Sequence, residues 1–182
     1  AGGFQLWVDA TRSDAVARLR ERKHRDAKPF AVMVRDLGDA ERLGDLSEIE
    51  MELLASAAAP IVLVKGLVDS PLAAEVAPGC STVGLCLPAS PLQMLLCKQF
   101  GRPVVATSGN LSDEPLCFEP AEAIERLGRI ADLLLVHNRR ILQAADDSVV
   151  RVTAGKPRMI RRARGYAPAP VVMPGRASSP GL

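Results

Sequence analysis

Short apolar runs alternate with helical patterns along most of the chain, and this alternation constrains the fold more than any other feature of the sequence. Four compact runs are typical of buried strands: residues 30–34, 61–64, 103–107 and 133–136. Two further strands are predicted at 148–152 and 157–162, joined by a turn at Ala154 and Gly155. This alternation favours an α/β fold, here a twisted mixed sheet with flanking helices and some antiparallel pairing.

Helices are predicted between these strands from capping residues and from the spacing of apolar side chains. The segments are residues 13–23, residues 39–57 as two short helices, residues 90–101 and residues 119–127. Ser13 is expected to cap the first helix, and Gly44 to divide the second segment. The third segment has Ser90 as its N-cap, a proline directly after it and a glycine at its end, so both of its boundaries are marked.

Length and composition indicate one compact domain. The chain has 182 residues, of which 48% are apolar, enough to bury a single core. After Tyr166, alanine, proline, glycine and serine dominate without periodicity, so we expect a domain at 1–168 and a linker or disordered tail at 169–182. The net charge of +2 is too small to bind nucleic acid through overall charge, so any phosphate chemistry requires local clusters.

Several features favour a protein of a reducing compartment. The four cysteines include no CxxC pair, so buried, reduced thiols are expected rather than a zinc knuckle or a disulfide framework. The longest apolar stretch, at about 53–64, is broken by Ser56 and Pro60 and is shorter than the roughly 20 residues of a spanning helix. No signal peptide precedes it. The sequence therefore predicts a cytoplasmic protein that does not enter a membrane.

The first candidate site is a basic segment between the first helix and the next strand, RERKHRDAKPF at 20–30. Lys23, Arg25 and Lys28 would crowd one short turn there, and guanidinium and ammonium groups on a rigid turn can grip a polyphosphate. The alternative is a solvated basic helix end, which the helix dipole favours. Spacing alone leaves both interpretations open.

The second candidate is a turn at Gly109 that follows an apolar strand, within ATSGNLSDEP at 106–115. Thr107, Ser108 and Asn110 would be exposed at the strand end, where α/β sheets present ligands. Small hydroxyl and amide groups beside a glycine can contact a phosphate, a ribose or a planar acyl group. The alternative is an ordinary turn in which these side chains cap the local backbone.

A third cluster, IRRARGY at 160–166, ends a predicted strand with three arginines. Alternation along a strand places Arg162 and Arg164 on one face and Arg161 on the other, so only part of the cluster can face one site. An edge strand guarded by charge explains the cluster about as well.

Two other segments carry polar side chains beside predicted strands. Asp146 and Asp147 precede Ser148, and an acidic pair near phosphate-binding cations could hold Mg²⁺, although aspartates that form a turn are more common. His137 and Asn138 directly follow another predicted strand. His137 could serve in acid–base chemistry, but a histidine without a visible partner is more often structural.

Taken together, these segments resemble, in order and spacing, the YrdC-like domain of the HypF-type carbamoyltransferases, a family of hydrogenase maturation. Across about residues 2–170 the matching strings are GGFQLWVDAT, RKHRDAKPFAVMVRDL, ATSGNLSDEP, LVHNRRI, DDSVVRV and IRRARGYAP. The basic KHR segment, the SGN turn and the RRARGY end are independent of one another, which makes the resemblance specific. It implies a YrdC-like sheet with a cationic nucleotide-binding cleft, similar to that of the threonylcarbamoyladenylate synthases.

The resemblance implies a reaction in which carbamate, released from carbamoyl phosphate elsewhere in the enzyme, joins ATP to give carbamoyladenylate and pyrophosphate. Mg²⁺ would enter with ATP, and fixed cations would stabilise the charge that adenylation builds on the phosphates. The implied catalytic residues are Lys23, Arg25, Ser108 and Asn110. The implied nucleotide-binding residues are Lys23, Arg25, Lys28, Thr107, Ser108, Asn110, Ser148, Arg162 and Arg164. Because carbamate attacks directly, no nucleophilic side chain is required.

The resemblance also implies partners and exposes departures. In the family an acylphosphatase, a zinc-finger and an acyl-transfer domain complete the pathway, and a thiol-bearing hydrogenase maturation protein accepts the carbamoyl group. A further helix and strand normally precede the GGF segment, so the domain is expected to be truncated at its N-terminus. Where the family usually shows a His pair this sequence has Gln93 and Met94, and in place of an Arg-Cys pair it has Ala144 and Ala145.

Two alternatives remain open. The chain could be a threonylcarbamoyladenylate synthase that acts in tRNA modification, which a requirement for threonine would reveal. It could also be a non-catalytic module that binds nucleotide, or double-stranded RNA by shape. Single-stranded RNA is a poorer ligand, because one Trp, one Tyr and four Phe offer few platforms for stacking bases.

Overall fold

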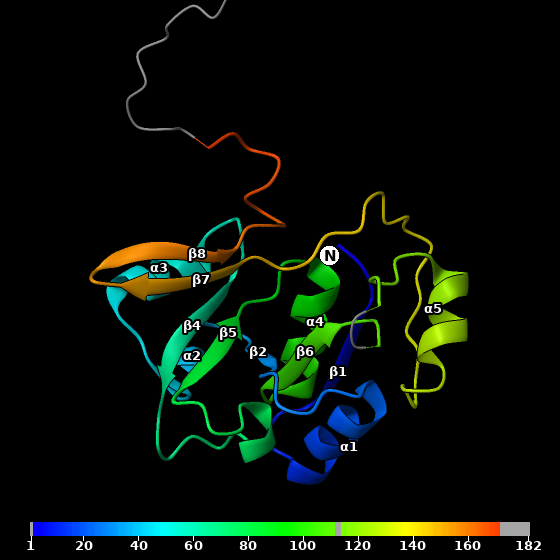
Figure 1. Cartoon of the computed structure of the whole chain (residues 1–182), viewed down its shortest axis with the longest axis horizontal. Helices are drawn as coiled ribbons and strands as arrows, with labels where there is room; N and C mark the ends of the chain where they lie inside the picture. Colours follow the sequence, from blue (N-terminus) through cyan, green and yellow to red (C-terminus); the bar gives the residue numbers. More distant parts are fainter. Residues whose placement is uncertain (1, 112–113, 172–182) are drawn as a thin grey trace, which may run out of the picture.

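The computed structural model describes residues 2–111 and 114–171. Its strands are β1 (Gln5–Asp9), β2 (Ala31–Met33), β3 (Gly44–Asp45), β4 (Ile61–Gly66), β5 (Thr82–Cys86), β6 (Val104–Ser108), β7 (Val149–Thr153) and β8 (Lys156–Arg161). They form one sheet in the order β1-β6-β2-β5-β4-β7-β8, with β3 paired to β4 (Figure 1). β2 runs parallel to β5 and β4 parallel to β7, whereas the other pairs are antiparallel. The predicted mixed sheet is confirmed.

Helices flank the sheet where the sequence predicts them. They are α1 (Ser13–Lys23), α2 (Leu37–Glu41), α3 (Glu48–Ala55), α4 (Pro91–Phe100) and α5 (Pro120–Leu127), with a 3-10 turn at Ala74–Val76. Both boundary signals of α4 are confirmed. The Ser90 side chain accepts a hydrogen bond from the Gln93 backbone N–H, and Gly101 closes the helix with a φ of 75°.

The predicted N-cap of α1 is wrong. Arg12 occupies that position with an extended backbone, and Ser13 is the first helical residue. The Ser13 hydroxyl donates instead to the Glu75 carboxylate at 2.7 Å, in the 3-10 turn. A charged acceptor brought close by the tertiary structure thus replaces the local backbone partner that the sequence suggested.

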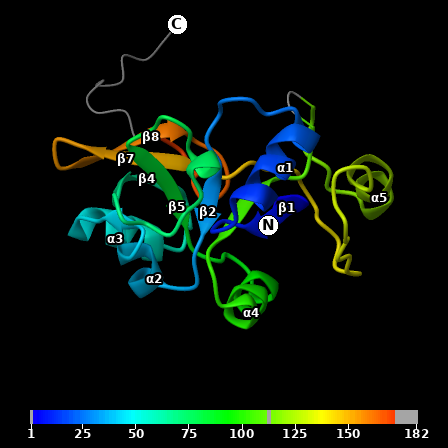
Figure 2. The same ribbon diagram turned by 90° about the horizontal axis from the view of Figure 1, so that it is seen from below.

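The two faces of the sheet bury different cores. On one face Val16 of α1 packs in a large cluster with Val105 of β6, and side chains of α2, α3 and α5 join it. On the other face α4 buries Cys97 against a smaller cluster that includes Val104. Successive residues of β6 therefore enter opposite cores, as strand alternation requires. Figure 2 shows α1 and α4 on opposite sides of β1 and β6.

One predicted strand does not form, and three strands, β1, β3 and β5, escape prediction. Residues 133–136 lie in an irregular segment between α5 and β7, where the Leu133 side chain is 87% exposed. An apolar run becomes a strand only beside an edge with backbone groups to pair, and β7 takes that place next to β4. β1 was missed because polar Gln5 and Asp9 end it, and β5 because Gly84 interrupts its apolar run.

The predicted β7–β8 turn is confirmed. Ala154 and Gly155 both have positive φ, at 51° and 67°, and join the two antiparallel strands directly. Two residues of positive φ match the right-handed twist of a strand pair.

The predicted burial of the four cysteines is confirmed for three of them and wrong for Cys80. No cysteine forms a disulfide, and Cys86, Cys97 and Cys117 are buried, whereas Cys80 is exposed. Cys80 lies in the turn that leads into β5, outside both cores. Within the described ranges, no helix is long and apolar enough to cross a membrane.

Candidate functional site

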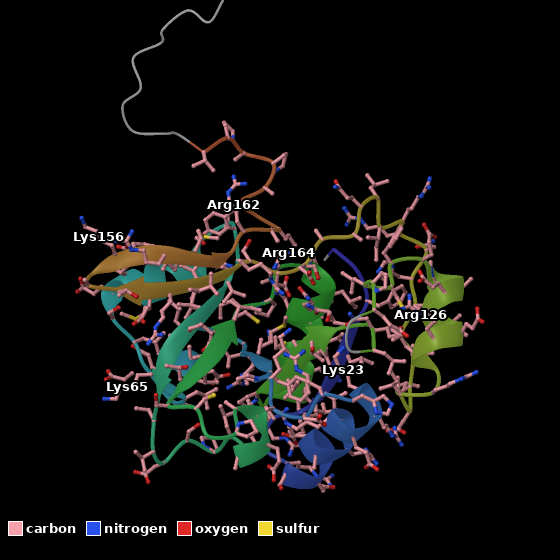
Figure 3. All side chains as sticks on the ribbon, in the orientation of Figure 1. Lys23, Lys65, Arg126, Lys156, Arg162 and Arg164 are labelled. Atoms are coloured by element: carbon pink, nitrogen blue, oxygen red, sulfur yellow. The ribbon has the colours of Figure 1, made fainter. Side chains whose placement is uncertain are left out.

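The basic segment and the SGN turn, distant in sequence, meet at Lys23. Its ammonium group donates to the Ser108 carbonyl oxygen at 2.8 Å, to Asn110 Oδ1 at 2.8 Å and to the Asn110 carbonyl oxygen. The Ser108 hydroxyl donates to the same Oδ1 at 2.6 Å, and the Asn110 amide donates to the Glu114 carbonyl oxygen at 2.6 Å. The end of α1 is thereby fastened to the end of β6, and Figure 3 shows Lys23 between the two elements.

Lys23 is buried at this junction, with only 1% of its surface exposed. Burial lowers the pKa of Lys23 to about 8, and the positive charge of Arg25 acts in the same direction. A buried cation that faces three oxygen atoms orients the turn from within the protein. Lys23 is therefore a positioning residue for Ser108 and Asn110, and its contact with phosphate stays a prediction.

The turn presents fewer side chains than expected. Thr107 is buried, with 8% exposure, because it lies opposite Leu6 on the face of the large core. Its predicted exposure at the strand end is wrong. Ser108 and Asn110 are half-buried, so these two carry the polar groups of the turn.

Sequence reasoning missed Arg20, which holds the loop that carries Arg25 and Lys28. Its guanidinium donates to the carbonyl oxygens of Arg25 at 2.9 Å, Asp26 at 3.3 Å and Lys28 at 3.2 Å. The Arg20 and Arg25 guanidinium carbons lie 4.6 Å and 4.9 Å from the centre of the Phe30 ring. The available signal was the position of Arg20 on the buried stripe of α1.

Arg25 and Lys28 differ in how far the loop constrains them. The half-buried Arg25 donates to the carbonyl oxygens of Lys28 at 3.0 Å and Pro29 at 2.6 Å, whereas the Lys28 side chain is exposed. Burial lowers the pKa of Arg25, and the charges of Arg20 and Arg161 lower it further. Arg161 at the end of β8 is thus close enough to the basic loop to act on it electrostatically.

The arginines after β8 do not form the single face predicted for them. Arg164 pairs with Asp147 at 2.8 Å, and Arg162 donates to the Tyr166 carbonyl oxygen at 2.7 Å. The prediction is wrong because β8 ends before these residues, so strand alternation no longer governs them. Figure 3 shows Arg162 and Arg164 at the end of the β7–β8 hairpin that is opposite Lys156.

Ser148 joins two segments of backbone. It is fully buried, and its hydroxyl accepts from the Ala163 N–H at 2.8 Å and donates to the Arg164 carbonyl oxygen at 2.9 Å. Asp147 forms an ion pair with Arg164, while Asp146 is exposed. Residues 2–111 and 114–171 contain no group of three or more His, Cys, Asp or Glu that could hold a metal ion. Mg²⁺ entry with ATP stays a prediction.

His137 and Asn138 belong to a different part of the surface. They line a pocket of about 320 Å³ between the start of β1, the start of α5 and the irregular segment after it. Phe4 and Phe118 form part of its wall, and none of Lys23, Ser108 and Asn110 contributes to it. The structure therefore does not bring His137 and Asn138 into the Lys23 junction.

Sequence reasoning also missed a polar chain on the α4 side of the sheet. Gln5 donates from Nε2 to Asp147 at 3.3 Å, and its Oε1 accepts from Gln93 at 2.8 Å and from the Trp7 indole at 3.2 Å. Gln5 lies directly opposite Ser108 in the β1–β6 pair, so their side chains share a face. Gln93, noted in the sequence only as a departure from the family pattern, is 8% exposed.

Known proteins resemble this chain in sequence and fold. The Sua5/YciO/YrdC family model, described as "Telomere recombination", matches residues 1–163. A carbamoyltransferase HypF of Synechocystis sp. is 50% identical over 173 residues, which are 95% of this chain and 23% of that protein. A threonylcarbamoyl-AMP synthase of Bacillus subtilis is 28% identical over 162 residues, 84% of this chain and 47% of that protein.

A solved structure, full-length HypF in the phosphate- and nucleotide-bound form, superimposes with a TM-score of 0.91 at 46% identity. The match covers 95% of this chain and 27% of that one. The chain thus spans about a quarter of the length of the HypF proteins that it resembles.

Proposed function

The chain belongs to the Sua5/YciO/YrdC family and corresponds to the YrdC-like domain of the HypF carbamoyltransferases, and on this premise we propose that it activates carbamate with ATP. The product is carbamoyladenylate. Further domains of a longer protein complete the pathway. One releases carbamate from carbamoyl phosphate, and another passes the carbamoyl group to a cysteine thiol of a hydrogenase maturation protein.

The proposed step is a displacement at phosphorus. A carbamate oxygen attacks the α-phosphorus of ATP and forms a carbon–oxygen–phosphorus link. The bond from the α-phosphorus to the bridging oxygen of pyrophosphate breaks, and pyrophosphate leaves with the electron pair. Ionised carbamate has no proton to lose in this step, so the protein supplies charge and orientation rather than a base. Mg²⁺ bound to ATP neutralises part of the phosphate charge.

The observation that carries the proposal is the junction at which Lys23 bonds to Ser108 and Asn110. Lys23 fixes Ser108 and Asn110 at the end of β6, the kind of strand end where α/β sheets bind ligands. The loop with Arg25 leaves α1 directly after this junction, and the charge of Arg161 acts on it. Cations in fixed positions stabilise charge that develops during the reaction better than solvent does, because they need no reorganisation.

Exchange of labelled pyrophosphate into ATP tests the proposal. Ammonium bicarbonate solutions supply carbamate, and the chain should catalyse exchange only when carbamate and Mg²⁺ are both present. Arg25→Met removes a charged phosphate contact and should weaken ATP binding in calorimetry by about tenfold. Lys156→Met, a change at the far tip of the hairpin, is the matched control and should leave affinity unchanged.

Other outcomes identify the rival functions. Exchange that requires L-threonine together with bicarbonate would make the chain a threonylcarbamoyladenylate synthase, the activity named for its Bacillus subtilis relative. ATP binding without exchange under any of these conditions would leave a nucleotide-binding module. Retention of double-stranded RNA in place of ATP would point to the RNA alternative.

A further inference from the structure

A small hollow lies where β1 begins and β6 ends, beside residues 145–147. Its volume is about 20 Å³, its polar lining includes Gln5, Ser108 and Asp147, and Leu116 and Ala145 form part of its apolar wall. A cavity needs roughly 10–15 Å³ to hold one water molecule, so the hollow has room for a single small polar group.

Hydrogen bonds fix the side chains around the hollow. Gln93 is anchored at the start of α4, where its Oε1 accepts from the Ala89 N–H at 2.9 Å, and its Nε2 donates to Gln5 Oε1 at 2.8 Å. This bond directs the amide oxygen of Gln5 toward α4 and its nitrogen toward Asp147, at 3.3 Å. Two nitrogens of the Arg164 guanidinium donate to the other carboxylate oxygen of Asp147, at 2.8 Å and 2.9 Å. The hollow is therefore a preorganised polar site.

We propose that this hollow receives the NH₂ end of carbamate, and that Gln5 is the residue through which the chain selects unsubstituted carbamate. The inference rests on the proposed function. One N–H group of carbamate donates to the Asp147 carboxylate and the other to the Ser108 hydroxyl oxygen. Both acceptors keep lone pairs that their existing hydrogen bonds do not use. The remaining N–H of the Gln5 amide donates to a carbamate oxygen.

Two physical differences exclude carbamates that carry a substituent on nitrogen. Such a molecule has one N–H, so either Asp147 or Ser108 loses its partner. A ligand that leaves a polar group of the site unpaired binds much more weakly. Its substituent would also have to occupy the space of Leu116 or Ala145, which line the hollow. The same adenylation chemistry is thereby restricted to unsubstituted carbamate, the smallest carbamate that can accept the adenylyl group.

Gln5→Leu tests the role of the amide at nearly constant volume. The KM for carbamate in pyrophosphate exchange should rise by about tenfold or more, whereas the dissociation constant of ATP in calorimetry should not change. An unchanged carbamate KM in a folded variant, or an equal loss of ATP affinity, would overturn the assignment.

Gln93→Glu tests the same assignment without disturbing the helix cap. Glutamate keeps the oxygen that accepts from the Ala89 N–H and suits this position after Ser90, but it lacks the N–H that holds Gln5. The carbamate KM should rise while the melting temperature stays the same. Gln99→Glu, the same change at an exposed position of α4, should alter neither. Equal KM values in the two variants would contradict the inference.

Leu116→Ala tests the size limit. With methylamine and bicarbonate as the source of N-methylcarbamate, the wild-type chain should show no exchange. Leu116→Ala should gain exchange that stays weaker than with carbamate, because the missing N–H still leaves a polar group without its partner. Exchange by the wild-type chain with this substrate would refute selection by the hollow. If carbamate itself supports no exchange, the proposed function fails and this inference falls with it, whereas normal exchange with unaffected KM values refutes the hollow alone.

Discussion

A lysine at the end of an amphipathic helix usually extends into water, yet Lys23 is 1% exposed and bonds to the turn after β6. Burying a cation costs free energy unless polar partners compensate. The oxygens of Ser108 and Asn110 compensate here, because the ammonium group donates to both of their backbone carbonyls and to the Asn110 side chain. The helix end and the turn therefore depend on one another.

Lys23→Met should unfold more easily and lose ATP affinity together. Methionine fills similar space but donates no hydrogen bond, so the Ser108 and Asn110 carbonyls lose their buried partner. Each bond to a charged group contributes about 1.5–3 kcal/mol, and relief from burying the charge offsets part of the loss. Urea unfolding should show a net loss of about 1–3 kcal/mol. Lys28→Met, at an exposed position of the same loop, should leave stability unchanged.

The lowered pKa of Lys23, about 8 against an ordinary value of 10.5, gives two pH effects of opposite sign. Between these values the unfolded chain holds a proton that the folded chain has lost, so the unfolding free energy rises with pH. ATP affinity changes the other way, because a positive charge and a donor disappear as pH passes about 8. Urea unfolding and calorimetry between pH 7 and pH 10 measure both. Lys23→Met should flatten each profile, and a wild-type ATP affinity that is constant through pH 8 would contradict the assignment.

At the scale of elements, β1 fixes the position of the SGN turn. The Gly109 N–H donates to the Phe4 carbonyl oxygen at 2.7 Å, and the Gly109 carbonyl oxygen accepts from the Cys117 N–H at 3.0 Å. The backbone directly before β1 thus touches the turn without an intervening side chain. Local sequence indicates a turn at a glycine, but only the pairing of β1 with β6 requires this residue to lack a side chain.

Gly109→Ala should therefore loosen the turn. An added methyl group would lie 2.8 Å from the Phe4 carbonyl oxygen, closer than the backbone can allow without moving. Overpacking of this kind costs about 1–3 kcal/mol. Gly66→Ala is the control, because its nearest atom would be the Ser81 carbonyl oxygen at an ordinary 3.7 Å. Thermal melting should separate the two variants, and equal melting temperatures would show that β1 does not constrain the turn.

At the scale of the whole molecule, the fold places a cation from the C-terminal part of the chain within electrostatic range of the basic loop after α1. The charge of Arg161 at the end of β8 lowers the pKa of Arg25, which follows α1. Like charges held close to each other favour the binding of a polyanion between them. The cationic cleft that the family resemblance implies stays a prediction, and the effect of Arg161 on the pKa of Arg25 is the observation that motivates a test of it.

MgATP should stabilise the whole domain if these cations bind it. At a concentration 100 times the dissociation constant, linkage adds about 2.7 kcal/mol to the unfolding free energy. Arg161→Met should reduce the gain in melting temperature, whereas Arg158→Met, an exposed change on the same strand, should not. The same gain in all three proteins would remove Arg161 from the site.

The sequence by itself determined the α/β class, most helices and the family resemblance, because these depend on local signals. Ser90 and Gly101 mark α4 whatever surrounds it, and the apolar run before Gly109 forms β6. The segments that form the candidate site were also recognisable from their charged and small polar residues. Each could be identified alone, without knowledge of its neighbours.

Tertiary structure alone decided how those segments combine. Lys23 reaches a turn 85 residues away, and Gln5 reaches Asp147 across 142 residues. Residues 133–136 form no strand. Arg162 and Arg164, after β8, bond to different partners, Tyr166 and Asp147. Burial and hydrogen bonding are properties of distant residues brought together, so no local pattern could predict that a helix-end lysine would be buried or that a glutamine on an edge strand would line a polar hollow.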